Sequence, residues 1–349
     1  MTFLDIHVLQ AMPPAGPRAV TYGGVPRATI RAGHWRRVIR EVFLADPGLV
    51  DEAGLQTTRL PQLIADRLAA RIPALAPDAD VIGAAATVAA FGPVRFAMAG
   101  RPMTDKPLFL GEGQIERIVL RLAETRMDLL DAAGDDERLE KIVGKLALDD
   151  VVRTGHPGAV ALFGRLMPGD RARTVTSAVT LTHAVSTHVV TANKVGDCSE
   201  EPNDGATLYR FATVNTCDLT GNLGGARDRA VDLAIAFTRA FTTSDSARPD
   251  FVLCNVREGS AVNLAGAFEE PVRPVEGGVL YESARRLLIY QRDQDEVYAQ
   301  QPIRTAGACP AWLADRLCAD GDLDVPDLSS LPSTLGGIRA ALADRLAQG

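Results

Sequence analysis

The order in which the hydrophobic pattern changes along the chain limits most strongly how it can fold. Short alternating runs predict β-strands, and apolar residues recurring three or four positions apart predict helices. A long helical block over residues 60–150 interrupts the alternating runs, and residues 174–185 fit either a strand or a helix. The segments predicted outside these stretches are a strand at Phe3–Leu9, a helix at His34–Leu44, strands at Thr187–Thr191 and Thr207–Asn215, a helix at Ala226–Phe241 and a strand at Phe251–Val256.

Without the helical block, the order is strand, helix, strand, strand, helix, strand. This is the order of ferredoxin-like and RNA-recognition folds, and it predicts the α+β class. The chain has 349 residues, more than the ~150 of a common domain, so a discontinuous arrangement is expected. We predict an RRM-like domain over residues 1–44 and 160–265, a helical insertion over 45–159, a short loop over 190–206 and a helical C-terminal part over 266–349.

Charge is distributed unevenly along the chain. The whole chain has a net charge of −7, but residues 6–40 contain six arginines and no acidic residue. Without those six cations, the remaining 31 basic and 44 acidic residues give a net charge of −13. An acidic body with one basic segment is typical of a protein that meets a polyanion through a single face. A solvated surface helix is the alternative interpretation of the same pattern.

The helix predicted over His34–Leu44 separates apolar from basic side chains. Its apolar residues recur at helical spacing and are Trp35, Val38, Ile39 and Val42. Arg36 and Arg40 are four positions apart on another side, where guanidinium groups can bind phosphates in bidentate fashion. Gly33, directly before the helix, leaves the N-terminal amides open to an anion. We interpret Trp35 as a core residue, and we favour the same interpretation for Tyr209 and Phe211 over base stacking.

Motifs of catalysis and metal binding are weak or missing. The five cysteines form no Cys-x-x-Cys pair, which argues against a disulfide framework or a zinc site and fits a reducing cytoplasm. His183 and His188 are five positions apart, a spacing that does not bring two ligands to one ion. No phosphate-binding loop, His-Glu-x-x-His or Gly-x-Ser-x-Gly motif occurs. We expect no catalysis, cofactor or metal.

No signal peptide or apolar run of ~20 residues occurs, so we expect a cytoplasmic protein without a membrane partner.

Several segments, taken together and in order, resemble the CasC family. CasC is the repeated backbone subunit of type I-E CRISPR Cascade, a surveillance complex guided by crRNA. The matching segments are Phe3–Leu9 with Pro13-Pro14, Tyr22-Gly23-Gly24, Leu162-Phe163-Gly164-Arg165-Leu166, Thr182–His188, Tyr209–Asn215 and Asn222-Leu223-Gly224-Gly225. The resemblance covers residues 3 to about 270, and the C-terminal part matches only in its helical character.

The resemblance implies a right-hand architecture with an RRM-like palm, helical fingers and a thumb. It implies copies that assemble head to tail along crRNA, contact other Cascade subunits and present guide bases for pairing with target DNA. It also implies a role without catalysis. The thumb corresponds to the short segment from Val190 to Asp204, where relatives often have many more residues.

The family's RNA-contacting positions carry over to this chain residue by residue. The basic residue before the aromatic-Gly-Gly motif corresponds to Arg18, and the two basic positions of the first helix correspond to Arg36 and Arg40. Leu166 stands where the family has Met in Gly-Arg-Met, after Arg165. Arg31-Ala32-Gly33 replaces the family's Ser-Ser-Gln. The predicted RNA-binding residues are Arg18, Arg27, Arg31, Arg36, Arg40, Arg165 and Leu166.

Two other functions remain as alternatives. A metal-dependent ribonuclease on the same fold would need an acidic residue next to bound RNA, and Asp197 or Asp204 in the short loop is the candidate. A protein-interaction module that binds no nucleic acid is the second alternative.

Overall fold

A computed structural model describes residues 1–12, 18–97, 100–165, 174–190, 205–244, 248–275 and 278–348, with the backbone alone for residues 18 and 19. The chain forms two compact units. Unit 1 comprises Met1–Ala45, Ser177–Leu219 and Arg227–Gly349, and unit 2 comprises Asp46–Thr176 and Thr220–Ala226. Leu166, Asp197, Asp204 and most of the loop predicted over 190–206 lie outside the described residues.

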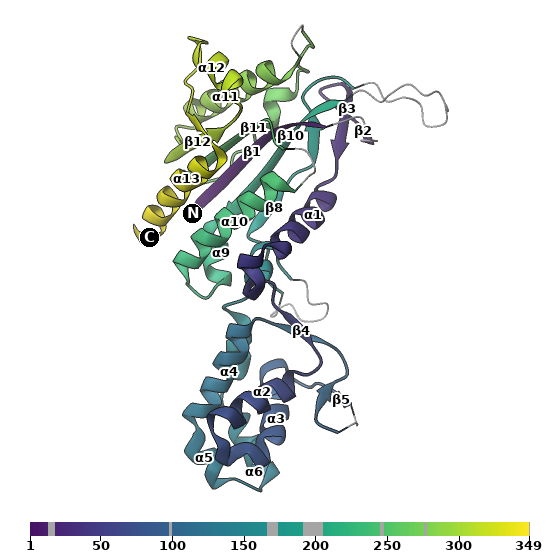
Figure 1. The fold of residues 1–349 in the computed structure, drawn as a ribbon, viewed down its shortest axis with the longest axis vertical. Helices are drawn as coiled ribbons and strands as arrows, with labels where there is room; N and C mark the ends of the chain where they lie inside the picture. The colour runs from purple at the N-terminus through teal and green to yellow at the C-terminus, as the bar shows by residue number, and fades with distance from the viewer. Residues whose placement is uncertain are drawn as a thin grey trace, which may run out of the picture. The chain divides into compact units, whose positions relative to one another are not determined.

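Unit 1 is built on one nine-stranded sheet (Figure 1). Its strands are β1 (Thr2–Met12), β2 (Arg18–Tyr22), β3 (Val25–Ile30), β8 (Val179–Leu181), β9 (Ala184–Ser186), β10 (Ala206–Asn215), β11 (Phe251–Glu258), β12 (Arg304–Ala308) and β13 (Asp327–Ser329). They follow the order β13-β12-β11-β1-β10-β9-β3-β2, and β8 also pairs with β10. All pairs are antiparallel except β12 with β13.

Three helices cover one face of this sheet: α1 (Ala32–Ala45), α10 (Arg227–Thr243) and α13 (Leu331–Gln348) (Figure 1). Leu4, Ile6 and Val8 alternate along β1 and are fully buried. Arg210 of β10 shows how α1 and α10 meet over the sheet. Its guanidinium carbon lies 3.7 Å from the ring centroid of Trp35 on α1 and 4.6 Å from that of Phe241 on α10.

The second face of the sheet is also covered. The 3-10 helix η4 (Leu264–Phe268) and the helices α11 (Leu280–Val297) and α12 (Ala311–Cys318) form one hydrophobic cluster with alternate residues of the central strands. The strand residues of this cluster are Leu9, Tyr209, Phe211, Phe251 and Leu253. Tyr209 is 1% exposed and Phe211 4%, so the interpretation of both as core residues is confirmed.

Unit 2 is mainly helical, as the pattern over residues 60–150 predicts. Its helices are η1 (Pro47–Glu52), α2 (Leu60–Arg71), η2 (Pro73–Asp78), α3 (Ala79–Phe91), α4 (Glu112–Glu124), α5 (Arg126–Asp131), α6 (Asp136–Val143), α7 (Leu148–Arg153) and α8 (Gly158–Phe163). Its short strands are β4 (Leu55–Thr57), β5 (Phe96–Ala97), β6 (Met103–Thr104) and β7 (Leu108–Leu110), which pair β4 with β7 and β5 with β6. Helix α9 (Thr216–Asn222) runs across the boundary of the two units.

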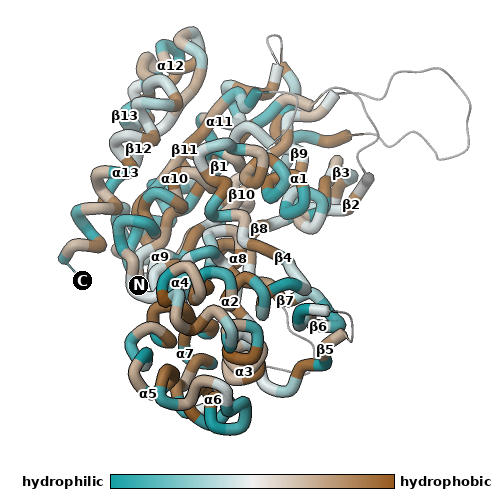
Figure 2. The backbone as a smooth tube through the Cα atoms, turned by 60° about the horizontal axis from the view of Figure 1, so that its bottom comes forward, coloured by the Kyte–Doolittle hydropathy of each residue, from teal (hydrophilic) through white to brown (hydrophobic). Residues whose placement is uncertain are grey.

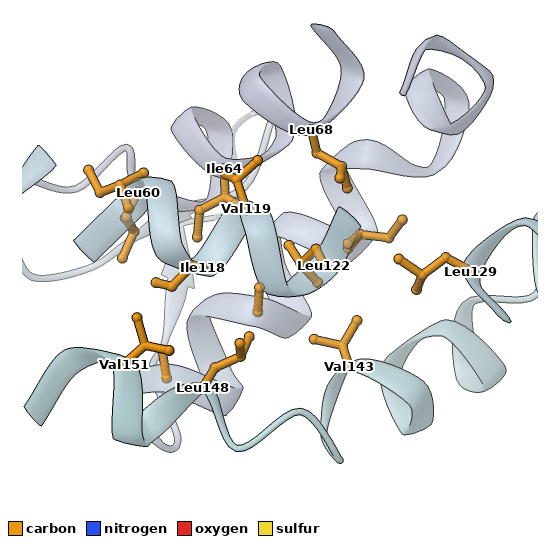
Figure 3. Packing of buried hydrophobic residues seen from close by; sticks show 14 of the residues in the cluster. Leu60, Ile64, Leu68, Ile118, Val119, Leu122, Leu129, Val143, Leu148 and Val151 are labelled. Atoms are coloured by element: carbon orange, nitrogen blue, oxygen red, sulfur yellow. The ribbon is translucent and has the colours of Figure 1, made fainter. Parts of the chain in front are cut away.

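The core of unit 2 follows from the four-residue spacing of its apolar side chains. Leu60, Ile64 and Leu68 on α2 point toward Ile118 and Leu122 on α4 (Figure 3). The run Pro73–Phe91 is long and apolar enough to cross a membrane by length and composition alone. Figure 2 shows this hydrophobic colour along α3. Because α3 packs its apolar side into the same buried cluster, its composition is explained by the core of unit 2.

The α+β class is confirmed, but two predicted details are wrong and one element is missing from the prediction. The strand predicted at Thr187–Thr191 lies earlier, at Ala184–Ser186, because the Ser186 hydroxyl donates to the carbonyl of His188 (2.8 Å) and turns the chain. The C-terminal part is not purely helical, since β12 and β13 extend the sheet. The hairpin β2–β3 was not predicted as strands. Gly23 and Gly24 form its turn at φ +59° and +77°, a conformation that glycine adopts readily.

Candidate nucleic-acid interface

Helix α1 exposes arginines because its apolar stripe faces the sheet. Trp35, Ile39 and Phe43 are four positions apart, and no more than 3% of each is exposed. Side chains on the opposite side of a helix with such a stripe face solvent. Arg37 and Arg40 lie there and are exposed. The predicted division of this helix into a buried and a basic side is therefore confirmed.

Arg36 lies at the border between the two sides of α1 and is half-buried. Its Nη1 donates to the Ser177 hydroxyl (3.4 Å) and its Nη2 to the Val179 carbonyl (3.3 Å), at the start of β8. These long hydrogen bonds place the guanidinium beside the sheet edge.

Arg31, Arg37 and Arg40 are the exposed cations of this segment. Arg31 directly precedes α1, and its carbonyl accepts hydrogen bonds from the amides of His34 (3.0 Å) and Trp35 (3.3 Å). Within the part of the chain that the structure describes, neither Arg31 nor Arg40 forms an ion pair. Arg37 approaches Glu41 at 4.0 Å, and both side chains are more than two-thirds exposed. Such an exposed pair contributes little, so Arg37 stays available to an anion. The set predicted from the sequence did not include Arg37, although its position beside Arg36 on the helix was a sufficient signal.

Arg27 is not part of this exposed group. It is 0% exposed, and its Nη1 donates to the Ser186 carbonyl (2.7 Å) while its Nη2 donates to the Phe268 carbonyl (2.8 Å). The prediction that Arg27 contacts RNA is therefore wrong for this structure, because the protein's own backbone surrounds its guanidinium. We exclude Arg27 from the candidate interface.

The remaining predicted residues lie elsewhere or outside the described side chains. Arg18 belongs to β2, where its backbone pairs with Thr29, and its side chain is not described. Arg165 belongs to unit 2, is half-buried and donates from Nη1 to the Phe109 carbonyl (3.1 Å). The structure therefore brings Arg31, Arg36 and Arg40 together on one segment of unit 1, and it does not place Arg165 in that unit.

The sheet face that carries the aromatic residues is closed by a polar network as well as by apolar packing. The Tyr209 hydroxyl lies 3.0 Å from Nδ1 of His7 and 3.1 Å from Oδ1 of Asn263, and it accepts a hydrogen bond from the Leu264 amide (3.0 Å). Nε2 of His7 lies 3.3 Å from Nδ2 of Asn255. Burial, assisted by the positive charge of Arg257, lowers the pKa of His7 to about 3, so the ring is neutral at physiological pH. This face therefore cannot stack bases in the way that the open sheet of an RNA-recognition domain does.

A buried ion-paired group lies beside that network. Arg257 of β11 pairs with Asp295 of α11, and its Nε lies 3.6 Å from Oδ2 of Asp5 on β1. Burial raises the pKa of Asp5 to about 6, although the Val262 amide and Arg257 both favour its charged form. The group lies beneath α11 and is structural.

The described residues contain no group of three or more His, Cys, Asp or Glu side chains that could hold a metal ion. His183 is exposed, whereas His188 is buried at 9% exposure, so the two do not face one site. Asp197 and Asp204, on which the ribonuclease alternative depends, lie outside the described residues.

Comparison with known proteins finds one matching family and solved structures with a similar fold. The sequence model of the CT1975-like protein family matches residues 4–194 and 200–324. No curated protein sequence matches the chain. The fold is similar to a chain of a structure described as a CRISPR RNA-guided surveillance complex, at a TM-score of 0.62 and 24% identity, covering 97% of this chain and 99% of that one. A chain of a second structure, of the same description in a pre-nicking state, has a TM-score of 0.60 and 23% identity and covers 97% and 100%.

Proposed function

Because the chain belongs to the CT1975-like protein family, we propose that it is an RNA-binding subunit of a CRISPR RNA-guided surveillance complex. The observation that carries the proposal is the group of exposed arginines at the start and along the outer side of α1, on a protein with a net charge of −7. The shared fold with chains of such complexes supports the same function.

The proposed contact is electrostatic. Arg31 and Arg40, with Arg36 at the sheet edge and Arg37 beside them, neutralise phosphates of a single RNA strand and release its counterions. The N-terminus of α1 adds the positive end of a 14-residue helix whose first turn carries no acidic side chain. None of these groups is specific for a base, so the sequence would be read by pairing between guide and target. Arg18 and Leu166 belong to the same proposal through the family resemblance.

The finer assignment is a non-catalytic backbone subunit of a type I-E Cascade with an RRM-like palm. The strand order β11-β1-β10-β8, with α1 and α10 on one face, supports the palm. Since η4 and α11 cover the other face, RNA would lie along the α1 flank with its bases directed away from the sheet. In this assignment, copies assemble head to tail along crRNA, present guide bases to target DNA and contact other Cascade subunits.

The test is the salt dependence of RNA binding. The purified protein is titrated with a single-stranded RNA of mixed sequence between 50 and 300 mM salt (about the range in which phosphate contacts change affinity most). Each phosphate contact of a single strand contributes about −0.7 to the slope of log K against log salt. The double variant Arg31→Gln/Arg40→Gln should lose about 1.4 of that slope and bind more weakly at low salt.

The matched control removes the same charge from the other side of the sheet. Arg273 and Arg292 are exposed, the first after η4 and the second on α11, so Arg273→Gln/Arg292→Gln lowers the net charge equally. The control should keep the wild-type slope. Equal slopes for wild type and the α1 variant, with both proteins folded by circular dichroism, would refute the proposed interface.

A further inference from the structure

Arg27 needs another explanation, since it is a fully buried arginine in a segment where Arg31, Arg37 and Arg40 are exposed. We propose that Arg27 is a positioning residue for RNA binding. Its guanidinium binds the hairpin β2–β3 to the carbonyl groups at the end of η4 through hydrogen bonds, and the position of Arg31 depends on this contact. This inference rests on the proposed RNA-binding function.

The guanidinium of Arg27 joins three elements of unit 1. Besides Ser186 at the end of β9 and Phe268 at the end of η4, it donates to the Glu269 carbonyl at 3.2 Å. These three acceptors are backbone carbonyls. A buried cation is costly unless hydrogen bonds replace its water, and a guanidinium supplies several donors in a fixed plane. A neutral side chain cannot satisfy three carbonyls from two segments in this way.

The turn of the hairpin is held against the same segment. The Tyr22 hydroxyl donates to the Ala265 carbonyl (3.0 Å), and the Arg27 guanidinium lies 5.7 Å from the Tyr22 ring centroid. Gly23 approaches η4 so closely that a Cβ atom would collide with the carbonyl oxygen of Glu269. The Tyr22-Gly23-Gly24 motif is therefore explained by contact with residues 265–269, about 240 positions later in the chain.

The position of the hairpin is transmitted to Arg31 through continuous regular structure. Thr29 and Ile30 pair with Val185 and Ala184 of β9, and the Thr29 hydroxyl donates to the Ala184 carbonyl (2.7 Å). Arg31 follows directly, and its carbonyl starts the hydrogen bonding of α1. Because no loop separates Arg27 from Arg31, a displaced hairpin also displaces Arg31.

The experiment is a double-mutant cycle on RNA affinity with the full chain. Arg27→Gln should weaken binding of the mixed-sequence RNA about tenfold, the effect of losing one charge-assisted contact. The same substitution should have a much smaller effect when Arg31 is already Gln, because Arg27 acts mainly through Arg31. Arg27→Lys, which keeps the charge and three donors, should restore most of the affinity.

A control variant separates positioning from a loss of stability. Leu342 is fully buried on α13, which packs on β11 and β12 near the opposite edge of the sheet. Leu342→Ala should lower the stability of unit 1 and leave RNA affinity unchanged under conditions in which the protein is folded. If Arg27→Gln does not fold, Tyr22→Phe removes only the hydrogen bond to Ala265. It should then show a smaller loss of affinity that again decreases in the Arg31→Gln background.

Two results would overturn the inference: wild-type affinity for folded Arg27→Gln, or a loss of equal size with and without Arg31. The failure of the proposed function looks different, because Arg31→Gln would then have no effect of its own. If Arg31→Gln weakens binding and Arg27→Gln does not, only the positioning role is lost.

Discussion

Removing the hydroxyl of Tyr209 tests whether the second face of the sheet is a sealed core. The hydrogen-bond distances fit one assignment. The hydroxyl donates to Oδ1 of Asn263 and accepts from the Leu264 amide and from Nδ1–H of His7. Nε2 of the neutral ring then accepts from Nδ2 of Asn255. Tyr209→Phe removes one oxygen atom and keeps the ring within its apolar cluster.

The expected loss of stability depends on which hydrogen-bonding partners of the Tyr209 hydroxyl remain unsatisfied without it. Asn263 is exposed, so water can replace the hydroxyl there. The Leu264 amide and Nδ1–H of His7 are buried donors that lose their acceptor. An unsatisfied buried polar group costs about 1–3 kcal/mol, so with two such donors we expect Tyr209→Phe to lower the free energy of unfolding by about 2–6 kcal/mol.

The assay is urea denaturation followed by near-UV circular dichroism, with the slope of the transition compared between proteins. Tyr298→Phe is the control, because Tyr298 is 67% exposed and its hydroxyl contacts solvent. The control should change stability by less than about 0.5 kcal/mol. A Tyr209→Phe protein as stable as the control would show that water reaches this face, and the argument against base stacking there would fail.

Two further predictions concern the buried charges and the core of unit 2. Between about pH 4 and 6 the low pKa of His7 makes stability fall on acidification, whereas the raised pKa of Asp5 makes it increase, and the two nearly cancel. Asp5→Asn removes the second effect, so its stability in urea should fall relative to wild type by up to about 1.4 kcal/mol per pH unit from pH 6 to 4, and parallel pH profiles would contradict this reasoning. In unit 2, Ile118→Ala should cost about 2–5 kcal/mol of unfolding free energy, since Ile118 is fully buried between α2 and α7, whereas the exposed Leu120→Ala should change the urea midpoint little.

The central strands and the main helices could be predicted because their own side chains carry the signal. The alternation in β1, β10 and β11 identifies them as strands, but it does not show that both of their faces are covered, since alternation is typical of one covered face. The four-residue spacing in α1 and α2 reflects one covered side of each helix. Strand β12 could not be found in this way. It includes Gly307, where a Cβ atom would collide with Val252 and Leu328, so the packing requires a residue without a side chain. A pattern of alternating apolar residues does not show this requirement.

In the candidate site, the sequence predicts the exposure of Arg40 but not the burial of Arg27. The exposure of Arg40 follows from its place opposite the apolar stripe of α1, which the sequence shows directly. The burial of Arg27 does not, because its acceptors are the carbonyls of Ser186, Phe268 and Glu269, which lie about 160 and 240 positions further along the chain. Local pattern records how a residue relates to its own helix or strand. It does not show which backbone groups from distant parts of the chain will surround a side chain in the folded protein.

The position of β1 in the middle of the sheet has a consequence for synthesis on the ribosome. Leu4 pairs with Val214 on one side and with Val256 on the other, so β1 is synthesised before its two partners, which are translated more than two hundred residues later. At about 5–20 residues per second this delay is on the order of 10–40 s, during which an apolar strand has both edges open. Most of the helical unit is translated within that interval, and the nascent chain therefore completes its second unit before its first.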